Sequence, residues 1–487
     1  MTASTPGLSG FSLRVPRTRV RLSDWATWTG ADPGKVEAVV GRSFRVCRPS
    51  QNAYTLAADA VLDLIERFDV DPADIGMLAL GTESSTDNAA GAVLIRGMLD
   101  QALPQRGRSP IARACEVPEF KHACLGGVYA LKAAARYLQS DGRGKRAIVV
   151  SADIAEYERG STGEQTQGAG AVAMLLDTEP TLCGLDLARS GSASAYRGLD
   201  FRKPFARHRE PTYAAQTARL HDFPIFNGAY STQCYVEATV RAVDAMFERV
   251  SSSRQAFFDD VAAICCHRPY EHMPMQAMAA ALTWSIARES GAEGLAALCE
   301  GTDIDPQAVL HEVVSQPDLF GRVQSEGIEA SAFPAFMALV RTFRRSPAFK
   351  TFAQDKLRLG QTITAELGNL YTASLPAWLG AAFETAARDD LALAGRTILA
   401  MGYGSGDAAE AIPTTVVPGW TEAAGKLGFA GALEGAVDLT QAQYEALHDG
   451  APVEGLPEDP GFQIARVGDQ YEDRFQDLGV DYYDFCG

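Results

Sequence analysis

The sequence predicts an α/β fold with buried sheets, and two observations carry that prediction. Short apolar runs with strand propensity alternate with longer runs whose apolar residues recur at helical spacing. The composition, with 46% hydrophobic, 9% aromatic and 22% charged residues, is that of an ordinary globular protein. Because 487 residues exceed what one hydrophobic core usually serves, we expect two domains or a duplicated fold.

The predicted strands are short, continuous apolar runs, as expected for strands that are buried on both faces. They occupy residues 77–80, 147–150, 171–176, 262–266 and 397–401. Helical spacing occurs between them, for example at Leu56, Ala60 and Leu64. These helices should cover the faces of the sheets.

Two regions depart from this alternation. Residues 286–357 are rich in helix formers and acidic residues and have few strand signals, which predicts an inserted helical region. The sequence after residue 452 is acidic and aromatic. Because Tyr and Phe are rarely so dense in a disordered tail, we expect this segment to pack on the core.

Charge, hydropathy and cysteine usage exclude several classes of protein. The formal net charge of -17 argues against a nucleic-acid partner, because phosphate binding needs concentrated Lys and Arg. There is no secretory signal pattern and no apolar run near the roughly 18 residues of a membrane span, so we expect a cytoplasmic protein. The nine cysteines are scattered and form no C-x-x-C pair, which disfavours disulfide and zinc-ribbon frameworks.

Cys124 differs from the other cysteines in its sequence context. A polar stretch at 119–123 gives way to the thiol, then to Gly126 and Gly127, and then to a helical pattern. This order predicts that Cys124 lies at a helix N-terminus, where unpaired N–H groups and the helix dipole favour a thiolate. The two glycines would let a thioester approach closely.

Motifs along most of the chain match one known family in order. The first three are GTES at 81–84, the segment around Cys124, and CHRPY at 266–270. Six further blocks are SADIAEY at 151–157, EQTQGAGAVAM at 164–174, DFRKP at 200–204, NGAYS at 227–231, GNLYTAS at 368–374 and YGSG at 403–406. On these motifs the chain resembles the 3-hydroxy-3-methylglutaryl-CoA synthases of the thiolase superfamily.

The resemblance implies a thiolase-like fold, with two similar α/β halves in an αβαβα layered arrangement. The first half would be residues 1–177 and the second 178–452, with a helical insertion at about 286–357. Residues 453–487 would form an extension packed on the core.

The resemblance also implies an acyltransferase that condenses an acetyl thioester with a 3-oxoacyl thioester of the acetoacetyl type. The product is a 3-hydroxy-3-methylglutaryl-type thioester. Cys124 would carry the acetyl group, Glu83 would remove a proton from its methyl group, and His267 would bind and polarise the acceptor ketone. Glu83 and His267 both come just after predicted strands, at the strand ends where α/β folds place their sites.

Six further residues are expected from the resemblance to bind substrate: Asp153, Tyr157, Asp200, Asn369, Ser374 and Ser405. The first three match family positions that line the pocket and support the catalytic groups. The Asn and Ser of GNLYTAS match residues that hydrogen-bond the acceptor and shape the surroundings of an oxyanion. The GSG run at 404–406 would bring backbone N–H donors close to the substrate.

In the family, lysines soon after the catalytic histidine help to hold coenzyme A, and this sequence differs from the family there. Residues 268–276 read RPYEHMPMQ and contain no lysine. A carrier-protein thioester has the phosphopantetheine arm without the adenine nucleotide, and polyketide β-branching relatives use such substrates. We therefore expect either acyl-CoA or acyl-carrier-protein thioesters as substrates. A basic group that could face either one consists of Arg202, Lys203, Arg207, His208 and Arg209.

No metal and no cofactor beyond the thioester carrier are implied, and the resemblance suggests a homodimer. Cys265, Cys266, His267 and His272 are close in sequence, but strand alternation separates neighbouring side chains, which disfavours zinc. The run at 167–173 mimics a dinucleotide fingerprint without its acidic partner. Two alternatives stay open: a thiolase or ketoacyl synthase that does not use Glu83, and a non-enzymatic scaffold.

Overall fold

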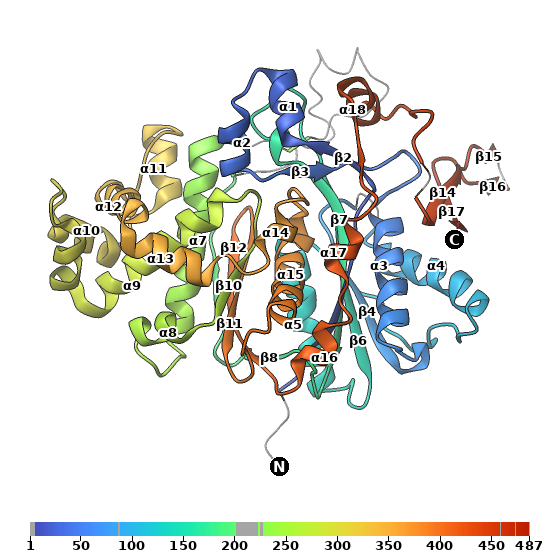
Figure 1. The fold of residues 1–487 in the computed structure, drawn as a ribbon, viewed down its shortest axis with the longest axis horizontal. Coiled ribbons are helices and arrows are strands. Elements are labelled where there is room, and N and C mark those ends of the chain that lie inside the picture. Colours follow the sequence, from blue (N-terminus) through green and yellow to red (C-terminus); the bar gives the residue numbers. More distant parts are fainter. Residues whose placement is uncertain are drawn as a thin grey trace.

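The computed structural model describes residues 5–85, 88–200, 223–224, 227–457, 459–472 and 474–486. At its centre is a ten-stranded mixed sheet (Figure 1). The strand order is β10 (Ala263–Cys266), β11 (Thr397–Gly404), β12 (Ala408–Val416), β8 (Cys183–Leu185), β1 (Gly7–Arg14), β7 (Gly168–Asp177), β6 (Arg146–Ala155), β4 (Ile75–Gly81) and β5 (Glu119–Phe120). The tenth strand, β9 (Gly191–Ser194), also pairs with β12.

The strand pairing is repeated in the two halves of this sheet. In the first half β4 and β6 are parallel, whereas β6 with β7 and β7 with β1 are antiparallel. In the second half β10 and β11 are parallel, whereas β11 with β12 and β12 with β8 are antiparallel. Strands β1 and β8 join the halves. The predicted duplicated α/β fold is therefore confirmed.

Helices cover both faces of each half and complete five layers (Figure 1). Helices α3 (Ala53–Arg67) and α4 (Gly91–Gln105) pack on the outer face of the first half. Helices α5 (Gly126–Gln139) and α15 (Ser374–Arg388) lie between the two halves. On the outer face of the second half, α7 (Gly228–Phe247) packs with α9 (His272–Cys299).

Local sequence explains why these elements form where they do. All seven residues of β4 are buried, which fits its unbroken apolar run. Helix α3 begins with a capping box between Asn52 and Thr55 and buries Leu56, Ala60 and Leu64 completely. Each buried leucine contributes about 1.5–3 kcal/mol by its removal from water.

A glycine contact brings β4 and α5 together beside the predicted site. A Cβ atom on Gly81 would lie 2.4 Å from the Cα atom of Gly127, so only glycine permits this approach. The end of β4 and the start of α5 therefore meet backbone to backbone.

A small cap region lies over one end of the halves. Its sheet has the order β13 (Val437–Asp438), β2 (Thr18–Arg21) and β3 (Ser43–Arg45). Helices α1 (Leu22–Thr29), α2 (Pro33–Val39) and α18 (Gln441–His448) complete it. Buried Val20, Trp25, Phe44 and Leu439 form a separate core there.

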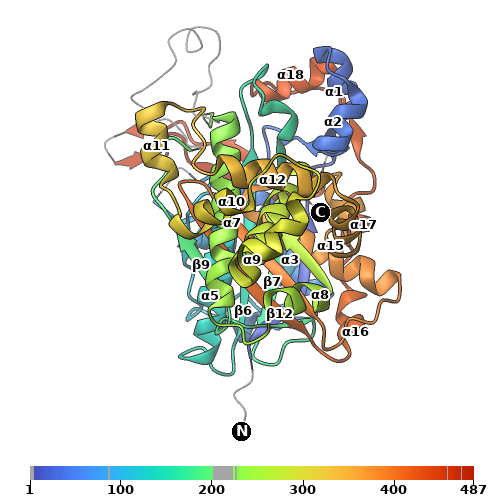
Figure 2. The ribbon, with the colours of Figure 1, turned by 90° about the vertical axis from the view of Figure 1, so that its left-hand side faces the viewer.

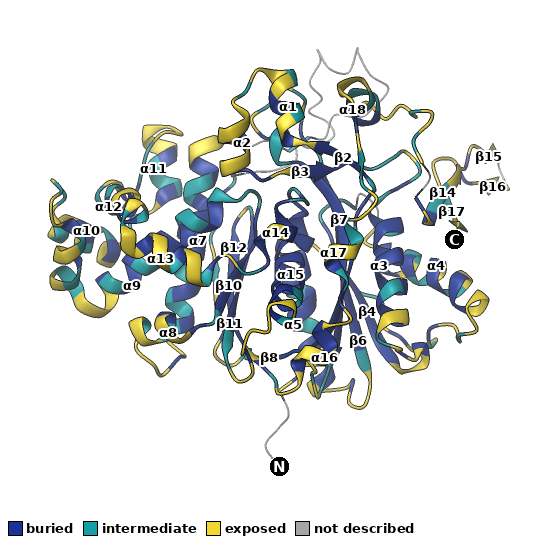
Figure 3. Ribbon diagram, in the orientation of Figure 1, coloured by how far each residue is buried: buried dark blue, intermediate teal, exposed yellow. Residues whose placement is uncertain are grey.

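The predicted helical insertion is present, and its first helix is the part of α9 that follows a kink at Gly291. The other members are α10 (Pro306–Ser315), α11 (Leu319–Glu326), α12 (Pro334–Arg345) and α13 (Pro347–Lys356), followed by α14 (Gln361–Thr364). Figure 2 shows α9, α10, α11 and α12 stacked outside α7. In Figure 3 their outward surfaces are exposed and their inner sides are buried. The short helix α8 (Arg254–Asp260) precedes β10.

The C-terminal segment forms two short helices and two hairpins. The helices α16 (Trp420–Ala424) and α17 (Phe429–Ala432) precede the cap region. One hairpin pairs β14 (Gly461–Val467) with β17 (Asp481–Cys486), and the other pairs β15 (Tyr471–Glu472) with β16 (Phe475–Gln476). Phe462 is buried against α3, where its N–H donates to Asp59 at 2.9 Å. None of the helices in the described ranges has the length and apolar character needed to span a bilayer.

Candidate active site

A cavity of about 280 Å³ lies between the two halves and below the cap region. Six of the predicted site residues line it: Cys124, Tyr157, Asp200, His267, Asn369 and Ser405. The remaining three, Glu83, Asp153 and Ser374, lie behind this lining and hydrogen-bond to residues of the site. The fold thus gathers all nine predicted residues at one place.

Cys124 precedes Leu125, the N-cap residue of α5, and so lies at the helix N-terminus predicted from the sequence. The preceding Ala123 has a φ of 41°, a conformation that non-glycine residues rarely adopt. The turn is closed by the Leu125 N–H, which donates to the carbonyl of His122 at 2.9 Å. This strained turn fixes where the sulfur points.

The surroundings of Cys124 favour the protonated thiol. Burial raises its pKa well above the ordinary value, and the negative charge of Glu83 raises it further. Burial and the neighbouring carboxylate thus act against the thiolate that a helix N-terminus favours. A base must remove the proton before the sulfur can react.

Glu83 is placed to be that base. It is the second residue after the end of β4. Its Oε2 atom lies 3.9 Å from the Sγ atom of Cys124, within reach of a hydrogen bond from the thiol. The thiol and the carboxylate therefore form a unit that can move a proton without solvent.

Asp153 holds this unit in place from below the cavity. The residue is fully buried, and its Oδ1 atom accepts hydrogen bonds from Thr82 Oγ1 at 2.9 Å and from the N–H groups of Glu83 and Ser84 at 2.8 and 3.0 Å. Its Oδ2 atom accepts from the N–H of Thr372 at 2.9 Å and from that residue's hydroxyl. Asp153 thus joins the loop after β4 to the segment before α15, and it does not line the cavity.

His267 occupies the position after β10 that corresponds to the end of β4. Burial lowers the pKa of its imidazole to about 3, so the ring is neutral near pH 7. The ring stacks on Tyr403 with 6.3 Å between centroids, and Tyr235 donates its hydroxyl to the His267 carbonyl at 2.8 Å. A neutral imidazole held in this way can offer an N–H to a carbonyl oxygen.

Asn369 and Ser374 act as a pair before and at the start of α15. The Asn369 Oδ1 atom accepts from the Ser374 hydroxyl at 3.1 Å and from the Tyr371 N–H at 2.9 Å. The Ser374 oxygen also accepts from the Leu370 N–H at 2.9 Å. Because these bonds use the amide oxygen, the amide nitrogen is what Asn369 can offer to a ligand.

Two tyrosines surround the thiol. Tyr157 and Tyr371 meet edge to face with 6.4 Å between centroids and form a small buried cluster with Cys124 and Ala155. Sequence reasoning did not select Tyr371, although it lies inside the GNLYTAS block. The sequence did contain an indication, because Tyr371 is an aromatic residue between the predicted site residues Asn369 and Ser374.

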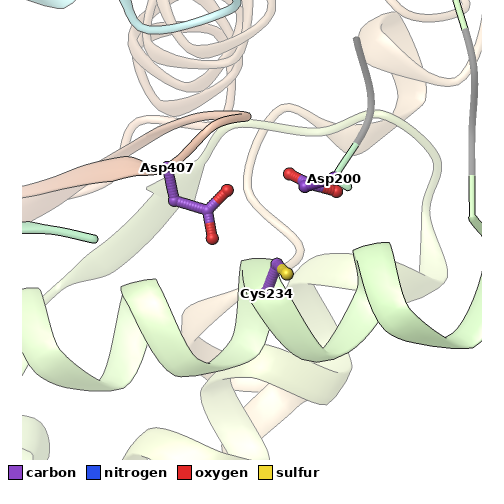
Figure 4. A group of neighbouring side chains, drawn as sticks. All are labelled: Asp200, Cys234 and Asp407. Atoms are coloured by element: carbon purple, nitrogen blue, oxygen red, sulfur yellow. The ribbon is translucent and has the colours of Figure 1, made fainter. Parts of the chain in front are cut away.

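Asp200, which lines the same cavity, belongs to a buried acidic group that sequence reasoning missed. Figure 4 shows Asp200, Cys234 of α7 and Asp407 pointing toward one another, and their polar atoms lie within 4.8 Å. The Tyr403 hydroxyl lies 2.8 Å from Asp200 Oδ2 and 3.0 Å from Asp407 Oδ1. The signal in the sequence was an acidic residue directly after YGSG, at the end of a predicted strand.

The basic residues considered for phosphate binding, Arg202 to Arg209, lie outside the described residues. A different basic group ends α12, with Arg341, Arg344 and Arg345. Burial raises the pKa of Tyr270, which lines the cavity, and the charge of Arg344 opposes part of this rise. Within the described ranges, none of the three arginines has an acidic partner.

Comparison with known proteins agrees with this geometry. The models for the N-terminal and C-terminal parts of hydroxymethylglutaryl-coenzyme A synthase match residues 3–180 and 346–444, together more than half of the chain. The hydroxymethylglutaryl-CoA synthase of Enterococcus faecalis is 26% identical over 91% of both chains.

Two solved structures have the same fold. MvaS in complex with 3-hydroxy-3-methylglutaryl coenzyme A is 26% identical, with a TM-score of 0.75 over 99% of each chain. The curacin pathway HMG synthase in complex with its apo donor-ACP is 18% identical, with a TM-score of 0.70 over 99% of this chain and all of that one. The chain therefore belongs to the hydroxymethylglutaryl-coenzyme A synthase family and is a condensing acyltransferase of that type.

Proposed function

We propose that Cys124 carries the acetyl group, that Glu83 moves protons to and from it, and that His267 binds the acceptor. The observation that carries this proposal is the 3.9 Å contact between the Cys124 thiol and Glu83 at a cavity that His267 also lines. A thioacyl group on Cys124 would place its methyl group near the same carboxylate.

Each step follows from the groups in place. Glu83 accepts the thiol proton, and the thiolate attacks the acetyl thioester, releasing the thiol of its carrier. Glu83 then removes a proton from the methyl group, and the resulting enolate attacks the ketone carbon of the acceptor, whose oxygen is polarised by His267 and Asn369. Hydrolysis of the bond to Cys124 frees the product.

We propose coenzyme A as the carrier of both acyl groups, with no separate metal or organic cofactor. The relatives include an enzyme named hydroxymethylglutaryl-CoA synthase, and the basic end of α12 beside Tyr270 supplies cations where residues 268–276 have no lysine. Arg268 cannot serve, because its buried side chain is held by the carbonyls of Thr364 and Val40.

A carrier-protein thioester is the second candidate. The missing lysines favour it, and the curacin synthase structure contains a donor carrier protein. We also propose a cytoplasmic homodimer, as the family resemblance implies. Light scattering on the purified chain tests the dimer.

The test of the proposed function uses the wild type and Cys124→Ala. After incubation with acetyl-CoA, the wild-type peptide that contains Cys124 should gain the mass of an acetyl group, and the variant should not. Condensation with acetoacetyl-CoA should fall by about four orders of magnitude in the variant, because no other group replaces the nucleophile. Acetylation absent from the wild type, or condensation retained by the variant, contradicts the proposal.

Supplying acetoacetate on CoA and on a carrier protein in parallel distinguishes the two candidates. Preference is read from kcat/KM for each acceptor. A carrier-bound acceptor that is used at least tenfold better than the CoA form would transfer the assignment to the second candidate.

A further inference from the structure

The buried acidic group around Tyr403 has no role in the steps derived so far. Asp200 is 1% exposed and Asp407 is 4% exposed, and one tyrosine hydroxyl bonds both carboxyl groups. A hydroxyl has a single proton, so it can donate to only one of the two carboxyls and must accept from the other. The geometry is therefore satisfied when the two carboxyls hold one proton between them.

The condensation needs a proton at the acceptor oxygen. As the carbon–carbon bond forms, the electron pair of the ketone double bond moves to the acceptor oxygen, which must be protonated. His267 is neutral, and an imidazole that donates its only N–H proton outright would become an imidazolate. Glu83 lies on the side of Cys124.

We propose that Asp407, Tyr403 and Asp200 form one proton-holding unit in the cavity wall, and that this unit supplies the proton to the acceptor oxygen. Asp200 and Tyr403 line the cavity, whereas Asp407 does not. Asp407 thus acts through the other two and is a positioning residue. This inference rests on the proposed roles of Cys124 and Glu83.

The protons balance over one turnover. The acceptor oxygen takes one proton from the unit, which leaves both carboxyls ionised, while Glu83 holds the proton from the methyl group. Hydrolysis of the acyl-Cys124 bond releases a carboxylic acid that gives up a further proton. One of the last two protons refills the unit, and the other leaves to solvent.

The groups that face Asp407 support a held proton. From the described elements packed around it these are Asp200, Tyr403, Cys234, Tyr230, Arg197 and Glu237. Burial and the charge of Asp200 raise the pKa of Asp407 to about 9. The nearest cation, Arg197, is bound to Glu237 at 2.9 Å, so much of its charge is already compensated. Burial also keeps the Cys234 thiol protonated, with a raised pKa.

The test is the pH profile of condensation in wild type and Asp407→Asn. Asparagine keeps the size and the hydrogen bond to Tyr403 but leaves one carboxyl, so the unit can no longer share a proton between two. We expect kcat at pH 8 to fall roughly 10- to 100-fold, the alkaline limb to move down by about one pH unit or more, and acetylation of Cys124 to be unchanged. The control is Asp59→Asn, another buried carboxyl, remote from the cavity and bonded to Phe462.

Each possible outcome of this experiment either supports or overturns the proposed proton-holding unit. A wild-type profile in Asp407→Asn, or a profile that shifts equally in Asp59→Asn, overturns the proton-holding unit while leaving the proposed function intact. Equal losses of acetylation and condensation at every pH would mark Asp407 as structural and also overturn it. Absence of acetylation in the wild type would instead contradict the proposed function itself.

Discussion

The two halves of the molecule place different chemistry at equivalent positions. Glu83 follows β4 and His267 follows β10, and these strands have the same pairing in their halves. Cys124 precedes α5, whereas Asn369 and Ser374 lie before and at the start of α15. The duplicated scaffold thus supplies two strand ends and two helix starts, and the side chains differ.

The electrostatic character of the halves differs in the same way. In the first half, burial and the carboxylate beside the thiol raise the pKa of Cys124, and we propose this carboxylate as the base. In the second half, burial leaves His267 neutral, so it donates a hydrogen bond without bringing a charge into the cavity. Under the proposed function, the first half activates the acetyl donor and the second receives the acceptor.

Among the variants that test this division of roles between the two halves, Glu83→Gln should lose the most condensation activity. Glutamine keeps the shape but cannot remove the methyl proton, so condensation should fall by about 10³-fold. Acetylation of Cys124 should slow less, because solvent can take a thiol proton while the enolate forms only beside a base. Exchange of deuterium from solvent into the acetyl methyl group should be lost.

The matched control is Glu164→Gln, a buried glutamate whose carboxylate accepts from Tyr444 and not from the thiol. Its exchange rate should equal that of the wild type. Full condensation in Glu83→Gln would favour a thiolase or ketoacyl synthase mechanism and would end the division between halves.

His267→Gln tests the second half. Condensation should fall by about 10²-fold with a higher KM for the acceptor, because the polarising N–H is displaced. Acetylation of Cys124 should be unchanged within about twofold, since this step belongs to the first half. A parallel loss of acetylation would show that the halves do not divide the reaction.

The same variant changes the acid stability in a defined direction. The pKa of His267 is about 3 in the folded protein and 6.5 in the unfolded chain, so the unfolded state binds the proton more readily. The contribution of the neutral His267 side chain to the free energy of unfolding is fully present above pH 6.5 and is lost as the pH falls toward 3. Between pH 7 and 5 the wild type should therefore lose about 2 kcal/mol more than His267→Gln, measured by urea unfolding. Equal losses would contradict a buried neutral imidazole.

Local patterns in the sequence predicted an α/β fold with buried strands, and the family resemblance supplied the two similar halves and the site residues. Apolar runs such as the one in β4 are buried on both faces, and the polar residue that follows is delivered to a strand end. The protonation of Cys124 could not be predicted, because it depends on how deeply the thiol is buried and on a carboxylate 41 positions earlier in the chain. Asp407 was missed for the same reason, since its importance comes from Asp200 and Cys234 on other elements.

The smallest effect concerns the basic end of α12, where the charge of Arg344 opposes part of the rise that burial causes in the pKa of Tyr270. Replacing Arg344 and Arg345 with Glu should raise the KM for acetoacetyl-CoA about three- to tenfold and leave kcat unchanged, because these side chains would meet phosphates rather than reacting atoms. The effect should shrink in high salt, where partly exposed charges are screened. Arg388→Glu, an exposed arginine at the far end of α15 paired with Asp389, is the control for added negative charge. If the double variant lost affinity for a carrier-bound acceptor but not for acetoacetyl-CoA, the arginines would serve carrier docking, and the second candidate substrate would replace the first.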